Sequence, residues 1–171
     1  MPAGLTMERH RDLQGRLQAQ WVRRALLALL GIICILGLLD VFGQEPQETH
    51  GAARTAELEV QAPSGVRGGL LYQARFTVRA LQELKDAQLV LSPGWADGIT
   101  INTIEPSPIG EASRDGRLVF DLGHVPAGQK HVLYMDFQVN PTTVSRRTLE
   151  VALDDGDRQL LSVRRSFTIF P

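Results

Sequence analysis

The chain has 171 residues, which is enough for one ordinary domain and an appendage. Its 18 basic and 19 acidic residues nearly cancel, and this balance argues against a nucleic-acid-binding protein. The one cysteine, Cys34, excludes an intramolecular disulfide and a thiolate metal site. Only Lys85 and Lys130 accompany the many arginines, a bias common in GC-rich bacterial genomes. A domain built from this chain must be stable through its hydrophobic core alone.

A hydrophobic run near the N-terminus predicts a membrane-spanning helix. Residues 25–39 read ALLALLGIICILGLL and carry no charge. This run is short for a bilayer, whose hydrocarbon core of about 30 Å needs roughly 20 helical residues. Trp21, Arg23 and Arg24 extend it, because tryptophan favours the membrane interface and arginine stems reach the headgroups. We therefore predict a transmembrane helix over 21–43, with these three residues as its membrane-anchor flanks.

The charges on either side of the run predict its orientation. Arginines dominate the segment before it, whereas acidic residues follow it. The positive-inside rule then places residues 1–20 in the cytoplasm and the chain after Gly43 outside the cell membrane. A cleaved secretory signal is the alternative, because Val41-Phe42-Gly43 loosely fits a cleavage site. The long basic leader and the long apolar core favour an uncleaved signal anchor.

The rest of the sequence has the pattern of a linker followed by β-strands. Residues 44–55, QEPQETHGAART, are polar and predict a flexible linker. In LLYQARFTVRA, at 70–80, apolar and polar residues alternate as in a half-buried strand. Similar runs occur at 56–61, 87–92, 98–104, 117–122, 131–139, 147–153 and 159–170. Seven to eight short strands separated by turn signals predict an all-β fold, an antiparallel β-sandwich over 56–171.

Three motifs that contain turn residues follow one another within this region. Leu91-Ser92-Pro93-Gly94 follows the early strand, FDLGHVPAGQ occupies 120–129, and FQVNP occupies 137–141. From Leu70 to about Thr143 the chain thus resembles the Ig-like conserved repeat domain of bacterial surface proteins. The resemblance implies an Ig-like sandwich acting as a surface or interaction module, and it implies no chemistry. The chain departs from that family at 80–84, ALQEL, where the family usually has an Asn-x-Gly turn.

The sequence contains no set of residues typical of a catalytic site or a metal site. His124 and His131 flank a turn, and nothing supplies a third ligand at zinc spacing. It contains no nucleophile elbow, phosphate loop or HExxH motif. The turn at 154–157, DDGD, could ligate calcium, but Asp-Gly is also favoured at a hairpin tip and the turn interpretation is preferred. We expect no enzyme, no cofactor and no metal site.

Trp95 and Asp97, in the loop sequence PGWADG at 93–98, are the candidate binding residues. A tryptophan on a loop between strands can anchor a partner, because aromatic side chains dominate interface energetics. With Asp97 beside it, Trp95 could also stack on a sugar ring. The alternative, which we favour, is that Trp95 folds back and caps one end of the sandwich.

These features together predict a non-enzymatic, single-pass membrane protein that presents an extracytoplasmic β-sandwich interaction module. We expect an accessory subunit of a membrane or envelope complex. Its partners would be the lipid bilayer and a membrane or envelope protein, with no nucleic acid. The alternative function is a carbohydrate- or cell-wall-binding surface domain that uses the Trp95 loop. The sequence leaves the partner, the oligomeric state and the biological process open.

Overall fold

The computed structural model describes residues 9–38 and 44–171, with helix side chains described from Gln20 onward. The chain forms two units, Met1–Gly43 and Gln44–Pro171. The first contains helix α1, Arg9–Leu38. The 19 residues of Gln20–Leu38 have a mean hydropathy of 2.0 and are long and apolar enough to cross a membrane. The N-terminal apolar helix is confirmed, and it is consistent with either a signal anchor or a signal sequence. The motif Val41-Phe42-Gly43 lies outside the described residues.

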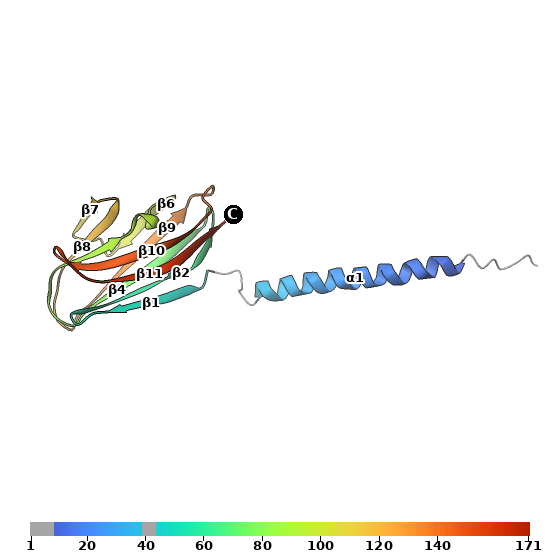
Figure 1. Ribbon diagram of the computed structural model, residues 1–171, viewed down its shortest axis with the longest axis horizontal. Helices are drawn as coiled ribbons and strands as arrows, with labels where there is room; N and C mark the ends of the chain where they lie inside the picture. Colours follow the sequence, from blue (N-terminus) through green and yellow to red (C-terminus); the bar gives the residue numbers. More distant parts are fainter. Residues whose placement is uncertain (1–8, 39–43) are drawn as a thin grey trace, which may run out of the picture. The chain divides into compact units, whose positions relative to one another are not determined.

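The second unit is a sandwich of two β-sheets (Figure 1). One sheet has five strands in the order β1-β2-β4-β9-β6, and the other has six in the order β3-β11-β10-β5-β8-β7. The five strands of the first sheet are β1 Pro46–Ala52, β2 Ala56–Pro63, β4 Leu71–Ala80, β9 Lys130–Val139 and β6 Ile99–Glu105. The six of the second are β3 Gly65–Arg67, β11 Arg158–Phe170, β10 Ser145–Asp155, β5 Leu84–Leu91, β8 Arg117–Val125 and β7 Gly110–Arg114. Among the strands of residues 44–171, only β3 and β11 pair in parallel.

The predicted β-sandwich is confirmed, but the predicted count of seven to eight strands is too low. Each of the eight predicted runs contains one strand of the structure, and three further strands are present: β1, β3 and β7. Strand β3 has three residues and β7 has five. Residues 111–114 of β7 are all exposed. Such short edge strands bury too little apolar surface to show an alternating sequence pattern.

The predicted flexible linker over 44–55 is wrong, because most of it forms strand β1. This strand pairs antiparallel with β2 over its whole length, from Pro46 opposite Pro63 to Ala52 opposite Glu57. Gly51 explains how a polar strand fits there: a Cβ at this position would lie 2.4 Å from Cγ1 of Val163 on the other sheet. The absence of a side chain lets β1 approach β11 closely. A polar edge strand of this kind resembles a linker in sequence.

The hydrophobic core lies between the two sheets and is built entirely from the second unit. Its largest fully buried side chains include Trp95, Phe76, Phe137, Phe167, Leu89 and Leu149. Buried and more exposed residues alternate over much of β2, β9 and β11, as period-two patterning requires, whereas β5 and β10 also contain consecutive buried residues. Burying an aliphatic or aromatic side chain of this size stabilises a fold by about 1.5–3 kcal/mol. The sandwich therefore contains a core of its own.

The sandwich has two ends, which we define by the chain. At the entry end β1 begins at Pro46, close to the end of β2 at Pro63 and the end of β11 at Phe170. Loops 64–70, 92–98 and 140–144 belong to this end. At the far end lie the connections 53–55, 81–83, 126–129 and 156–157. In Figure 1 the start of β1 and the C-terminus lie at the same end of the sandwich.

Candidate interaction surface

Trp95 is buried in the core and is not an exposed binding anchor. Pro93–Trp95 form a single turn of 3₁₀-helix that turns the indole inward, where it has no exposed surface. Its ring centroid lies 5.4 Å from that of Phe76 and 5.4 Å from that of Phe137. Its Nε1 donates a hydrogen bond to the Glu150 carbonyl, at 3.2 Å. The assignment of Trp95 as a binding residue is therefore corrected: it closes the entry end of the core.

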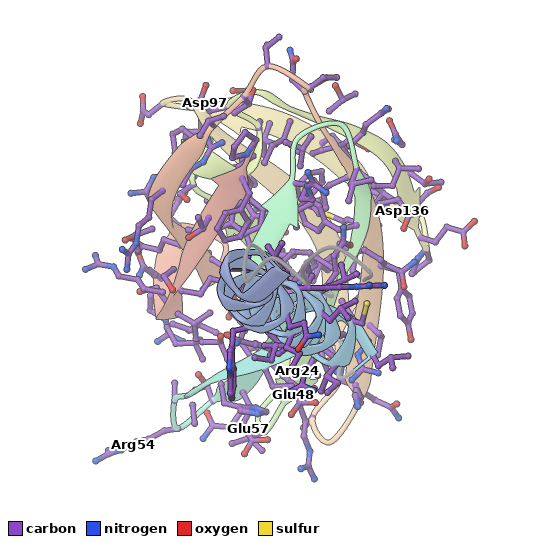
Figure 2. The ribbon with its side chains drawn as sticks, turned by 90° about the vertical axis from the view of Figure 1, so that its right-hand side faces the viewer. Arg24, Glu48, Arg54, Glu57, Asp97 and Asp136 are labelled. Atoms are coloured by element: carbon purple, nitrogen blue, oxygen red, sulfur yellow. The ribbon has the colours of Figure 1, made fainter. Side chains whose placement is uncertain are left out.

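Asp97 lies on the surface, two residues beyond the buried indole. Its side chain is 84% exposed, and in Figure 2 it lies at the periphery of the sandwich. The Arg147 guanidinium contacts the Asp97 carboxylate at 3.1 Å and donates to its carbonyl at 2.8 Å. The structure thus separates the two predicted residues. Asp97 fixes its loop to β10, and Trp95 offers no exposed ring face on which a sugar could stack.

A buried polar group lies beneath the entry end. Arg165, on β11, donates hydrogen bonds to the carbonyls of Ala62 and Pro63 and so joins β11 to the end of β2. Burial lowers the pKa of Arg165, and the nearby Tyr72 acts in the opposite direction. Burial raises the pKa of the Tyr72 phenol, which stays neutral. Arg165 is in the same period-two phase as the buried Val163 and Phe167. The exposed Arg164 is out of that phase and pairs with Glu150 at 3.1 Å.

The entry end carries exposed apolar side chains. Four of them define what we call the entry rim, with exposed fractions of 45% for Leu70, 59% for Leu71, 61% for Val144 and 51% for Phe170. Backbone hydrogen bonds tie their segments together, from Gly68 to the Phe170 carbonyl at 2.8 Å and from Val139 to the Leu70 carbonyl at 3.1 Å. The sequence did hold a signal for this rim: adjacent Leu70 and Leu71 cannot both face the core of a strand.

The far end has a polar surface. Asp155, in the acidic turn, accepts hydrogen bonds at 2.9 Å from the backbone amides of Lys85 and Asp86. Gly156 has a positive φ of 60° and donates to the Asp86 carbonyl at 2.8 Å. His124 contacts Glu83 at 2.9 Å. Within residues 9–38 and 44–171 no group of three or more His, Cys, Asp or Glu residues could hold a metal ion.

Two open concavities lie on the sides of the sandwich. One, of about 570 Å³, lies between β6 and β7, and Glu111 is the sole ionisable residue among those that line it. The other, of about 660 Å³, lies over β1, β2 and β4, and there Glu57 pairs with Arg79 across the strands at 3.6 Å. Charged pairs of this kind are ordinary on an exposed sheet face. Neither concavity holds a nucleophile with an adjacent general base.

The predicted membrane flanks lie on the surface of α1. Trp21 is 69% exposed, and Arg23 and Arg24 are also exposed. The guanidinium carbon of Arg24 lies 5.7 Å from the centroid of the Trp21 ring, within cation–π range. The exposed residues that follow them are large and apolar, namely Val22, Leu26, Leu27, Leu29, Leu30, Ile32, Ile33, Ile35 and Leu38. A short segment with an aromatic ring and two arginines thus precedes the apolar surface of α1.

Comparison with known proteins gives similarities of fold. No protein family and no curated protein matches the chain. Among solved structures, the CARDB domain of PF1109 from Pyrococcus furiosus is 11% identical at a TM-score of 0.44, over 74% of this chain and 97% of that one. CaCohA2 from Clostridium acetobutylicum is 13% identical at 0.46, over 74% and 92%. A non-cellulosomal cohesin from Archaeoglobus fulgidus is 14% identical at 0.39, over 74% and 92%. These similarities concern the β-sandwich and carry no inference about function.

Proposed function

We propose that this protein is a non-enzymatic, single-pass membrane protein whose helix holds a β-sandwich interaction module outside the cell membrane, as an accessory subunit of a membrane or envelope complex. The observation that carries the proposal is the pairing of two units in one chain. One is an apolar helix of membrane-spanning length, and the other is a sandwich whose core is built from its own residues. The hydrophobic core of such a sandwich is complete without side chains from the helix.

The charge distribution supports the orientation in this proposal. Arg9, Arg11, Arg16, Arg23 and Arg24 precede the apolar run. Basic residues beside a span are retained on the cytoplasmic side, so the sandwich would face outward. The bacterial Ig-like surface domains that the turn motifs resemble are the kind of module we place there. A helix retained as a signal anchor, and not cleaved, is part of the proposal.

The chemistry of the described surface favours binding over catalysis. The concavity between β6 and β7 is lined by Ile101, Ile104, Leu118 and Phe120 together with uncharged polar residues and one carboxylate, that of Glu111. Acid–base catalysis needs a titratable group poised beside a reacting atom. An open groove of mainly apolar and neutral polar side chains, with a single carboxylate, is better suited to contact with another protein.

Co-purification tests the proposal. Full-length protein is extracted in mild detergent and its partners are identified by mass spectrometry, with a helix-free chain beginning at Gln44 as the matched control. We expect an integral membrane or envelope protein that is recovered with the full chain and survives salt washing. Recovery of the full chain in the soluble fraction, without detergent, would refute the proposal.

The carbohydrate-binding alternative loses its main support, because it depended on an exposed Trp95. Its remaining test is a glycan pulldown with the same two chains. We expect no retention above that of a Trp95→Phe variant, which keeps an aromatic ring in the core.

A further inference from the structure

We infer that the entry end of the sandwich rests on the lipid surface of the membrane that holds its own helix, with the entry rim in the interfacial layer. This inference rests on the proposed membrane anchoring and goes beyond it, because a tethered domain can equally stand clear of the bilayer. It assigns a second membrane-binding element to the chain: a folded one, distinct from α1.

The first argument is the length of chain between the two elements. Seven residues, 39–45, separate Leu38 at the end of α1 from Pro46 at the start of β1. A chain advances by at most about 3.3–3.6 Å per residue, so Pro46 stays within about 29 Å of Leu38. Because 46–52 form a strand and not a linker, residues 39–45 alone set the longest distance between Leu38 and the entry end. The tether is shorter than the sequence pattern indicated.

The second argument is where the exposed apolar side chains lie. Leu70, Leu71, Val144 and Phe170 belong to the entry end, and Leu81 is the one large apolar side chain exposed in the far-end connections of the described chain. Exposed apolar side chains at one end of a domain are costly to leave in water and are typical of an interaction site. Four of the seven exposed large apolar side chains of the sandwich thus lie at the entry end, and the other three, Leu81, Ile109 and Tyr134, lie elsewhere.

The third argument is the charge beside this surface. In the parallel pairing of β3 and β11, Arg67 lies opposite Phe170, and both are exposed. Arg146 is exposed on β10, two residues after Val144. Arginines beside apolar side chains suit anionic headgroups above an acyl layer. Acidic residues at this end include Glu45 and Glu48 on the β1 side, where Glu48 accepts a hydrogen bond from Gln61, and the exposed Asp97, which pairs with Arg147.

A depth measurement on the full chain tests this inference. The native cysteine is removed by Cys34→Ala. A single new cysteine is then placed at the entry rim by Val144→Cys or at the far end by Leu81→Cys. Both positions are exposed aliphatic residues, so the two variants are matched. Each is labelled with an NBD fluorophore and reconstituted in vesicles of phosphatidylcholine and phosphatidylglycerol. Quenching is measured with lipids that carry a spin label near the headgroup.

We expect the label at residue 144 to be quenched at least two-fold more than the label at residue 81. Adding Arg67→Gln and Arg146→Gln should reduce that difference. Equal quenching at both positions would overturn the inference. A blue-shifted label at residue 144 that lipid does not quench would also overturn it, because the rim would then be covered by protein. Loss of the chain from the vesicles on alkaline carbonate washing would instead refute the membrane anchoring itself, and the inference with it.

Discussion

The two ends of the sandwich are closed by different kinds of side chain. At the far end, polar groups close the turns: the Asp155 carboxylate accepts two backbone amides, and Leu81 and Gln82 both donate to the Thr55 carbonyl, at 2.8 and 2.9 Å. At the entry end, one indole fills the core from inside while the rim outside it stays apolar. Hydrogen bonds to polar groups thus order the turns of the far end, whereas a buried aromatic ring orders the entry end.

Removing the Trp95 indole is the most damaging change that we expect at either end. Trp95→Ala should destabilise the fold by about 3–5 kcal/mol, because it leaves a cavity beside Phe76 and Phe137. Thermal unfolding followed by circular dichroism measures the loss. The control is Asp97→Ala in the same loop, whose exposed ion pair with Arg147 should contribute no more than about 1 kcal/mol. Equal losses for the two variants would contradict the capping role of Trp95.

The corresponding change at the far end is Asp155→Ala, with a smaller expected effect. It leaves the amides of Lys85 and Asp86 without their acceptor, and we expect a loss of about 1–2 kcal/mol in chemical denaturation. Asp157→Ala, on the same turn and exposed, is the matched control and should be close to neutral. If Asp157→Ala proved as costly as Asp155→Ala, the acidic turn would have a role other than the one described.

The pH dependence of stability should also come from the far end. Burial lowers the pKa of His131 below its ordinary value of 6.5. The native state then binds fewer protons than the unfolded state as the pH falls below about 6.5, so stability is lost down to the lowered pKa. Burial raises the pKa of Asp154, which acts in the opposite direction at lower pH. Thermal unfolding between pH 7.5 and 5.5 should therefore depend less on pH in His131→Gln. An unchanged slope would show that other groups control it.

The smallest effect on stability is expected at the entry rim itself. Val144→Ser and Leu71→Ser should each change the free energy of unfolding by less than about 0.5 kcal/mol, because both side chains already lie in solvent. Leu149→Ser, at a buried position of β10, is the matched control and should cost several times more. A large loss at Val144 would show that the rim is part of the core and not a surface.

Sequence periodicity was sufficient for the body of the fold, because strands with one buried face must alternate apolar and polar residues. It failed at β1, whose few contacts with the core depend on Gly51 having no side chain against Val163. Periodicity also did not predict whether Trp95 is buried, because a loop residue belongs to no alternating pattern that fixes which way its side chain points. The adjacent Leu70 and Leu71 signal in the sequence that one of them is exposed, but they do not show that residues 70, 144 and 170 come together at one end of the fold.

The central claim, a sandwich held outside the membrane by an uncleaved helix, is tested most directly by accessibility labelling. Asp157→Cys, at the exposed far end, is introduced into full-length Cys34→Ala protein. Right-side-out and inverted membrane vesicles are then treated with a membrane-impermeant maleimide. We predict labelling of residue 157 in right-side-out vesicles alone, on a chain of undiminished length that resists carbonate extraction. Labelling confined to inverted vesicles, or a shortened chain released in soluble form, would contradict the account.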